Sequence, residues 1–290
     1  MQKTLSNAAV SLSVDSFGAE MHSLQHDGVE YLWQADAAHW ARHAPVLFPI
    51  VGKLKNNQYC YDGKTYEMGG HGFARDSEFE LIEETTDKLV YQLTDSETTR
   101  AHYPFHFQLQ VSYQLIGNSV TVSYDVANTD DKPLYFGIGA HPAFNVPLQN
   151  GNFEDYQLTI SPAALRQEIP LDPPTGLLKL DTTFEIEKTV FPLTRELFKD
   201  DALVFKSTTE NVEIALTNKI DNHGVTVSFE NMPYFGLWSP YATDAPFACI
   251  EPWCGLADAE NTSGELTEKF AINALAPADS FHCQFAITLK

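Results

Sequence analysis

The chain has 290 residues, in which 18 lysines and arginines stand against 39 aspartates and glutamates, so its formal net charge is −21. A surface this acidic repels the phosphates of nucleic acids and of anionic membranes at long range. We therefore exclude both as partners. With 43% hydrophobic and 12% aromatic residues, the chain can bury a sizeable core, which predicts a folded globular protein.

No segment predicts export or membrane insertion. Residues 1–12 hold one lysine and no continuous apolar run, and no apolar stretch is long enough to span a bilayer. The cysteines are too few and too scattered for a disulfide scaffold in a chain of this length. They are Cys60, Cys249, Cys254 and Cys283. We expect buried, reduced thiols in a cytoplasmic protein.

Hydrophobic residues at every second position dominate the chain. The clearest case is the pair of runs 107–115 and 120–126, which flank the turn Gly117-Asn118-Ser119. This pattern predicts a β-hairpin with one buried face. The same alternation predicts strands at 79–82, 89–93, 212–216, 225–229 and 281–289.

Helical patterning is scarce. Residues 194–198 are the one segment for which we expect a short helix. Many strands separated by turns, with few helices, predict an all-β sandwich or barrel. The segment 170–176 holds three prolines and must be a loop, because proline cannot donate to a strand ladder. Strand patterning resumes on both sides of it without an internal repeat, so we expect a single domain over residues 1–290.

Three segments interrupt the strand pattern with glycine, proline and aromatic residues. They are 44–75, which contains APVLFPIVGKLKNNQY and GGHGFAR; 137–147, GIGAHPAFNVP; and 233–258, which contains PFACIEPWCGLAD. Such clusters around a single histidine or glutamate are typical of loops that hold a functional side chain. His141 and His71 are therefore candidates, although each could simply satisfy hydrogen bonds within its loop.

Glu251 is the more informative candidate. It follows Phe247-Ala248-Cys249-Ile250 and precedes Pro252-Trp253, so a carboxylate lies in an apolar, aromatic setting. Burying a carboxylate is costly unless it is paired or used. Such a setting raises the pKa of a carboxyl group toward the range in which it serves as a general base near neutral pH.

Together, these segments resemble the aldose 1-epimerase, or galactose mutarotase, family over most of the chain. GAHPAFNVP resembles the segment that bears the family's catalytic histidine, and the run from LWSP to PFACIEPWCG resembles the one that bears its catalytic glutamate. GGHGFAR is similar to a substrate-contacting His-Gly element, and PVLFPIVGKLKNNQY to the loop before it. The resemblance implies a large antiparallel β-sandwich, the galactose mutarotase-like supersandwich, whose concave face holds a sugar.

The resemblance also implies a chemistry and its residues. Interconverting the α- and β-anomers of a sugar requires one group to protonate the ring oxygen and another to remove the proton of the anomeric hydroxyl. By resemblance, His141 is the acid and Glu251 the base. Their roles swap on ring closure, so no cofactor is required. His71 and Arg75 would hold sugar hydroxyls or a nearby charge, and Trp238 would stack on the pyranose unless it belongs to the core.

One position departs from the family pattern. Many members carry arginine where this chain has Lys53, and lysine offers a single flexible charge in place of a planar fork. The HGFAR form with Arg75 resembles branches that act on hexose 6-phosphates. The partner is therefore expected to be a small sugar, either a free aldohexose or its phosphate, bound to a monomer or homodimer. The family's further substrate-binding acidic residue has no assigned position in this chain.

The sequence leaves three alternatives to consider. Histidine pairs four residues apart could ligate a metal on a helix, but strand geometry would hold their rings roughly 13 Å apart, so we expect no metal. The pairs are His22/His26, His39/His43 and His102/His106. A glycoside hydrolase would need a second carboxylate beside Glu251, and none has a comparable setting. A non-catalytic carbohydrate-binding protein would explain Trp238 and Trp253 without requiring His141 and Glu251.

Overall fold

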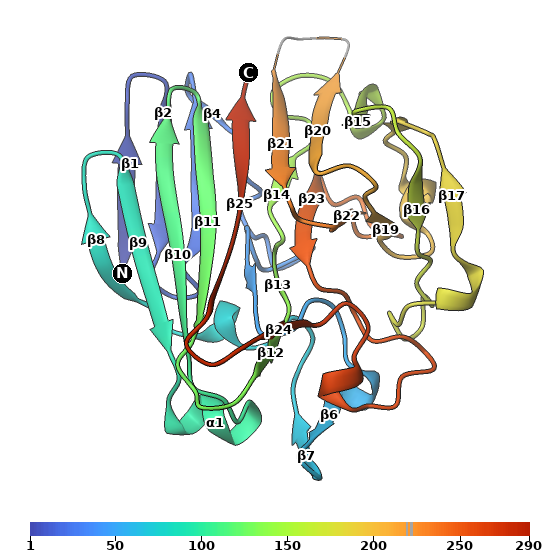
Figure 1. Ribbon diagram of the computed structural model, residues 1–290. Coiled ribbons are helices and arrows are strands. Elements are labelled where there is room, and N and C mark those ends of the chain that lie inside the picture. The colour runs from blue at the N-terminus through green and yellow to red at the C-terminus, as the bar shows by residue number, and fades with distance from the viewer. Residues whose placement is uncertain (219, 221–222) are drawn as a thin grey trace.

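The computed structural model describes residues 1–218, 220 and 223–290. Within these residues the chain forms stacked antiparallel β-sheets, which confirms the all-β sandwich predicted from the sequence. Figure 1 shows the strands of residues 2–15 and 80–128 side by side in one half of the molecule and the strands of residues 156–238 in the other. No helix among the described residues is long and apolar enough to cross a membrane.

The largest sheet in the described part of the chain has nine strands. Its central strands alternate strictly between buried and solvent-facing side chains, because one face packs on the core and the other meets water. In spatial order it contains β18 (Val190–Pro192), β15 (Tyr156–Ser161), β20 (Asn211–Asn218), β21 (Gly224–Glu230), β25 (Ser280–Leu289), β11 (Ser119–Asn128), β10 (Phe107–Ile116), β9 (Lys88–Thr94) and β8 (Glu80–Glu84).

A second sheet of shorter strands packs against the first. In spatial order it contains β17 (Phe184–Ile186), β16 (Arg166–Glu168), β19 (Leu203–Lys206), β22 (Tyr234–Trp238), β23 (Phe247–Cys254), β13 (Ile138–Ala140) and β5 (Val46–Leu47), and β14 (Ala143–Asn145) also pairs with β23. A smaller sheet contains β1 (Gln2–Ser6), β2 (Val10–Asp15), β3 (Glu20–His26) and β4 (Val29–Glu30). Two strand pairs complete the fold: β12 (Leu134–Phe136) with β24 (Asn273–Leu275), and β6 (Gln58–Tyr61) with β7 (Lys64–Glu67).

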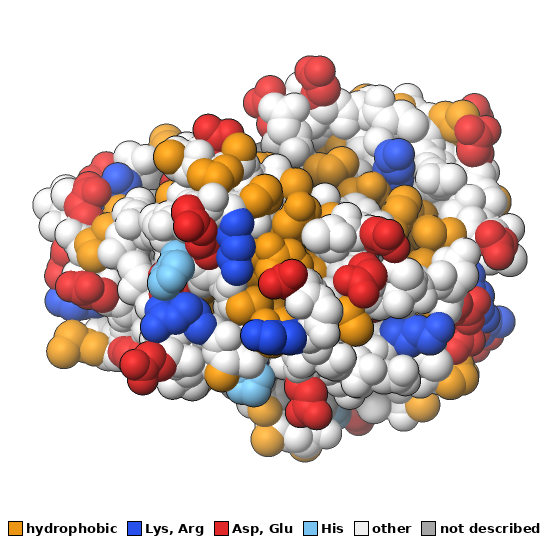
Figure 2. All heavy atoms as spheres, turned by 60° about the horizontal axis from the view of Figure 1, so that its bottom comes forward, with side chains coloured by type: hydrophobic (Ala, Val, Ile, Leu, Met, Phe, Trp, Pro, Cys, Tyr) orange, Lys and Arg blue, Asp and Glu red, His pale blue; other side chains and the backbone are white. Residues whose placement is uncertain are grey.

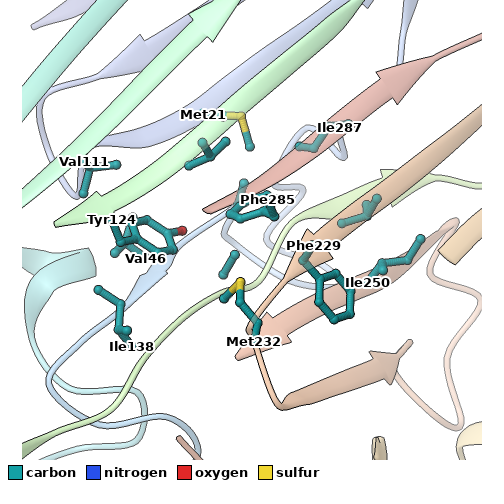
Figure 3. Packing of buried hydrophobic residues seen from close by; sticks show 14 of the residues in the cluster. Met21, Val46, Val111, Tyr124, Ile138, Phe229, Met232, Ile250, Phe285 and Ile287 are labelled. Carbon is teal, nitrogen blue, oxygen red and sulfur yellow. The ribbon is translucent and has the colours of Figure 1, made fainter. Parts of the chain in front are cut away.

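The core lies between these sheets. One hydrophobic cluster joins buried side chains from Leu5 near the N-terminus to Leu289 near the C-terminus. Each aliphatic or aromatic side chain that it buries contributes about 1.5–3 kcal/mol relative to exposure. Figure 3 shows side chains of both main sheets packed together: Val46, Ile138 and Ile250 come from the second sheet, and Val111, Tyr124, Phe229, Phe285 and Ile287 from the first. The single-domain interpretation remains a prediction.

The strands predicted from alternation are confirmed. The predicted hairpin is β10 and β11, whose turn is shorter than expected because Ser119 already pairs with Ile116. The other predicted runs coincide with β8, β9, β20, β21 and β25. The segment 170–176 is a loop, as predicted. Residues 195–198 form a 3-10 helix capped by Thr194, which confirms the short helix.

Three expectations were wrong or incomplete. Helix α1 (Glu97–His102) was missed, although Ser96 caps it through a reciprocal capping box with Thr99. Of the cysteines expected to be buried, Cys60 is partly exposed. Glu251 was expected in a loop but lies inside β23, whose residues are all buried. A strand buried on both faces shows a continuous apolar run instead of alternation, so β23 resembled an irregular segment.

Candidate active site

Strand register places His141 opposite Glu251. In β13, Gly139 pairs with Trp253 of β23. In β14, Ala143 pairs with Cys249 of the same strand. His141 lies midway between Gly139 and Ala143, and Glu251 lies midway between their partners, so the two side chains face each other. His141 Nε2 lies 3.2 Å from Glu251 Oε2, and the two side chains are 10% and 2% exposed.

The alternation of β23 turns this pair away from the main core. Ala248 and Ile250 belong to the core between the sheets, whereas Cys249 and Trp253 belong to separate clusters. Because side chains alternate across a strand, Glu251 projects from the other face of the sheet. A cavity of about 340 Å³ lies on that face, lined by Trp40, Val51, Gly52, Lys53, His71, Arg75, His141, Leu171, Gly176, Leu178, Asp201, Ala202, Val204, Trp238, Glu251, Trp253, Leu256 and Ala257.

All of the site residues expected from the sequence line this one cavity. The histidine and the glutamate come from the paired strands described above, and the others come from loops and strand ends far apart in the chain. These others are Lys53 after β5, His71 and Arg75 between β7 and β8, and Trp238 at the end of β22. The fold thus brings together the three segments that interrupt the strand pattern.

Burial shifts both members of the pair toward their uncharged forms. The pKa of Glu251 lies well above its ordinary value because the carboxyl is desolvated, and the charge of Asp201 adds to the shift. The pKa of His141 is lowered to about 3, chiefly by desolvation and further by Arg75 and Arg42. Between these two shifted pKa values the pair holds one proton.

Indole rings surround the pair. Trp40 lies 4.8 Å from the His141 ring between centroids, and Trp238 meets that ring edge-on at 5.6 Å. Trp253 also lines the cavity, and its Nε1 donates to Ala140 O over 3.1 Å. Sequence reasoning did not single out Trp40, because its segment shows no motif that points to the cavity.

Two glycines make room for the Trp253 indole. A Cβ atom at Gly139 would lie 2.5 Å from Trp253 Cδ1, and one at Gly236 would lie 2.3 Å from Trp253 Cη2. Neither position accepts a larger residue without moving the ring. Gly139 and Gly236 are therefore required for the packing of this indole, independently of any turn.

His71 is held in one tautomer. Gly52 N donates to His71 Nδ1 over 3.2 Å, and His71 N donates to Gly52 O over 2.8 Å. Because Nδ1 accepts, the proton of the neutral ring is on Nε2. Desolvation, together with His141 and Arg75, lowers the pKa of His71 well below its ordinary value. His71 is therefore a neutral N–H donor at the cavity.

The cationic side chains differ in how they are held. Arg75 Nη2 donates to Gly70 O over 2.7 Å, and its Nε lies 3.7 Å from Asp76 Oδ2. Arg42 binds the other oxygen of Asp76 at 2.8 Å. Lys53 forms no ion pair with any residue that the structure describes. Figure 2 shows one face of the molecule, on which basic side chains stand singly among acidic ones and hydrophobic side chains gather at the centre.

The structure also shows cavity residues that sequence reasoning missed. Asp201, in the left-handed region with φ 80°, lines the cavity near Glu251 and is the second carboxylate that the sequence did not reveal. The proline-rich loop supplies Leu171 and Gly176 to the cavity wall. A Cβ at Gly176 would lie 3.0 Å from Lys53 Cδ, so this loop packs directly on the lysine. No local pattern marks either contact.

A buried carboxylate supports the loop beside His141. Glu20 Oε1 accepts the backbone N–H groups of His43 and Ala44, each over 2.8 Å. His43 O in turn accepts from Ala143 N over 3.0 Å, and Pro45 O, two residues further along, accepts from His141 N over 3.2 Å. Glu20 thus fixes residues 43–45, and Pro45 in this segment binds the backbone of His141.

An antiparallel supersandwich that presents a buried His–Glu pair to a small cavity defines the class of galactose mutarotase-like proteins. The chain belongs to the aldose 1-epimerase family, whose sequence model matches residues 1–268. It is 32% identical over 295 residues to the protein LacX, chromosomal form, of Lactococcus lactis subsp. lactis, and the match covers 98% of each chain.

Solved structures agree with this assignment. A galactose mutarotase related enzyme from Lactobacillus acidophilus is 37% identical, with a TM-score of 0.97 over 100% of this chain and 97% of that one. A galactose mutarotase-like protein from Lactobacillus casei is 30% identical, with a TM-score of 0.92 and full coverage of both chains. The family and the supersandwich fold inferred from the sequence are confirmed.

We expect Glu20→Ala to lower the free energy of unfolding by about 2 kcal/mol or more, because one buried and one partly buried N–H group lose their acceptor and a buried donor left unsatisfied costs about 1–3 kcal/mol. Glu20→Gln keeps a carbonyl oxygen at the same place and should lose less than half as much. Urea unfolding of the variants measures both values. Equal losses for Ala and Gln would mean that the charge of Glu20, and not its acceptor, stabilises the loop.

Proposed function

We propose that this protein is a mutarotase, which interconverts the α- and β-anomers of an aldohexose. The observation that carries the proposal is the buried pair of His141 Nε2 and Glu251 Oε2, 3.2 Å apart, at a cavity of about 340 Å³. This volume is in the range of pockets that enclose small molecules, about 300–1,000 Å³. The family assignment supports the same reaction class, an isomerase acting on a sugar.

In the proposed cycle, Glu251 removes the proton from the anomeric hydroxyl while His141 protonates the ring oxygen. The bond from C1 to the ring oxygen breaks, and an open-chain aldehyde forms. Rotation about C1–C2 presents the other face of the aldehyde. On closure the ring oxygen returns its proton to His141, and Glu251 gives its proton to the new anomeric oxygen. Both side chains end in their starting states, so the cycle consumes no reagent.

The electrostatics of the pair suit this cycle. A raised pKa makes Glu251 a stronger base than an ordinary carboxylate. A buried histidine with a lowered pKa gives up its extra proton readily, so protonated His141 is a stronger acid than a free imidazolium. Because one proton serves the pair, the form with protonated His141 and ionised Glu251 differs from the uncharged form only in where that proton lies.

The remaining cavity residues would hold the sugar. His71 Nε2–H can donate a hydrogen bond to a sugar hydroxyl, and the carboxylate of Asp201 can accept one from another. Trp238 and Trp40 would cover the apolar C–H face of a pyranose, as aromatic rings commonly do for partly apolar ligands. Arg75 and Lys53 supply positive charge at the same cavity.

A hexose 6-phosphate is the second candidate substrate. Lys53 has no ion-pair partner among the described residues, and it lines the cavity together with Arg75 in a chain of net charge −21. Arg75 is shared between Asp76 and the backbone of Gly70, so it is only partly neutralised. This pair of cations favours an anionic group on the sugar.

We expect the protein to accelerate anomeric equilibration of freshly dissolved α-aldohexose, followed by polarimetry or by saturation-transfer NMR. Glu251→Gln and His141→Asn should each lower kcat by roughly 10²-fold or more, the scale for removing a positioned acid or base. His282→Asn is the matched control, because its ring makes a 2.7 Å contact with Asp125 on the exposed surface.

Because Glu251 lies in a buried strand, each variant must first show an unchanged far-UV spectrum and melting temperature. The absence of acceleration across free and phosphorylated aldoses would refute the mutarotase proposal. Sugar binding that persists in both variants, with no turnover in the wild type, would instead favour a non-catalytic carbohydrate-binding protein.

The pH profile follows from the shifted pKa values. The pair carries one transferable proton at any pH below the raised pKa of Glu251 and above the lowered pKa of His141. We therefore expect kcat/KM to stay level as pH falls through 6.5 and 4.5, the ordinary pKa values of the two groups. It should decline on the alkaline side, where the pair loses its proton. A decline on the acid side with an apparent pKa near 6.5 would show that His141 titrates as an exposed imidazole.

Substrate choice is tested at the cations. If an anionic group binds there, Arg75→Ala and Lys53→Ala should each weaken kcat/KM for the hexose 6-phosphate far more than for the free hexose. The difference should shrink at high ionic strength, because salt screens partly exposed charges. Measuring both substrates with each variant at low and high salt checks this. Equal losses for both substrates would mean that the cations bind hydroxyl groups, and a free aldose would be the substrate.

A further inference from the structure

A second cluster of ligand-forming side chains lies outside the catalytic cavity. Glu20 and His22 come from β3, and His43 comes from the loop before β5. A carboxylate oxygen and one ring nitrogen from each histidine lie within 4.8 Å of one another. His22 Nε2 is 4.0 Å from Glu20 Oε2, and His43 Nδ1 is 3.9 Å from Glu20 Oε1.

Sequence spacing concealed this cluster. The pairs weighed from the sequence joined His22 to His26 and His39 to His43, and neither pair was expected to hold a metal. The fold takes one histidine from each pair and stacks the rings of His22 and His43 at 4.3 Å between centroids. Twenty or so residues of chain separate the two, so only the packing of the loop on β3 brings them together.

A β-bulge in β3 places His22 beside Glu20. The register with β2 shifts so that Ser23 pairs with Ser13 and Met21 with Val14, which leaves His22 without an opposite residue. Met21 then enters the core, while His22 stays partly exposed. Bulges commonly re-aim a side chain in this way.

The carboxylate of Glu20 is fixed in position before any ion binds. Its Oε1 accepts two backbone N–H groups, and one of them belongs to His43 itself. The carboxylate is therefore anchored to the loop that carries one of the other ligands. Its Oε2 points toward His22. Asp15 pairs with Glu20 across the ladder, which places a second carboxylate on the neighbouring strand.

We propose that Glu20, His22 and His43 form a binding site for a divalent transition metal, with Zn²⁺ as the best fit. Two imidazoles and one carboxylate are a known zinc donor set, with water in the fourth position. Bonds of about 2.0–2.2 Å place tetrahedral ligand atoms about 3.3 Å apart. The present separations are at most 4.8 Å, so they need to close by at most about 1.5 Å.

One ring must also turn. The rings lie face to face, 19° from parallel, and a metal must lie near the plane of each ring that ligates it. His22 is the ring that turns, because 31% of its side chain is exposed and no hydrogen bond to a described residue holds it. The same exposure leaves an outward side where water completes the coordination.

Isothermal titration of Zn²⁺ into the metal-free full chain tests the site. We expect one ion per chain. His22→Ala and His43→Ala should each weaken Zn²⁺ binding by roughly 10–100-fold or more, because losing a ligand costs at least as much as losing a group that only hydrogen-bonds to a ligand. His26→Ala is the matched control, because His26 lies on the same strand beside Asp27 at 3.8 Å and lacks a second imidazole. Its affinity for Zn²⁺ should equal that of the wild type.

The absorption spectrum of bound Co²⁺ distinguishes this site from the catalytic cavity, where His141, Cys249 and Glu251 also lie close together. Co²⁺ bound at the proposed site has nitrogen and oxygen ligands and gives no thiolate charge-transfer band. Unchanged Zn²⁺ affinity in both His22→Ala and His43→Ala, no stoichiometric binding by the wild type, or a thiolate band with Co²⁺ would each overturn the proposal.

Discussion

The pairing of β23 with β13 and β14 is the constraint on which the site depends. One strand has two short partners in the same register, and the break between them leaves His141 opposite Glu251. The same register turns the alternate residues of β23 into the core, where Ile250 packs against the other sheet. A shift by one residue would exchange the two faces and bury the carboxylate in the core. The register that fills the core is therefore also the register that places the acid–base pair at the cavity.

Burial then sets the chemistry of the pair. A carboxyl group and an imidazole withdrawn from water both favour their uncharged forms, which raises the pKa of one and lowers that of the other. Neighbouring charges act in the same direction: the negative charge of Asp201 raises the pKa of Glu251 further, and the positive charge of Arg75 lowers that of His141. The indoles that exclude water from the pair are also the surfaces suited to a sugar ring. Water exclusion and ligand recognition thus rest on the same side chains.

Carboxylates outside the cavity hold its walls in place. Glu20 anchors the segment that binds the backbone of His141. On the far side, buried Asp258 accepts from Lys55 N and pairs with buried Lys269 at 2.9 Å, which ties down the loop that carries Lys53. Breaking a buried pair of this kind by removing one partner costs about 3–5 kcal/mol. Part of the acidic composition is therefore structural, although most of the acidic side chains remain at the surface.

Much of this could be predicted from the chain alone. Alternation with a period of two determined the all-β class and located β10, β11 and β25, because a half-buried strand must alternate. The cost of burying a carboxylate marked Glu251, and glycine- and proline-rich settings marked His141 and His71. The family resemblance added Arg75, Lys53 and Trp238, and all of these residues line the cavity. The strand β23 was mistaken for a loop, because burial on both faces removes the alternation.

Only the tertiary structure decided which distant residues meet. Trp40, Asp201 and the loop with Gly176 reach the cavity through packing that leaves no local pattern in the sequence. His22 and His43 stack because a bulge re-aims one and Glu20 anchors the other. Periodicity reports how each segment is buried, so the sequence by itself determined the strands and the candidate acid–base residues. Long-range register and loop packing depend on contacts between segments, and these exist only in the folded chain.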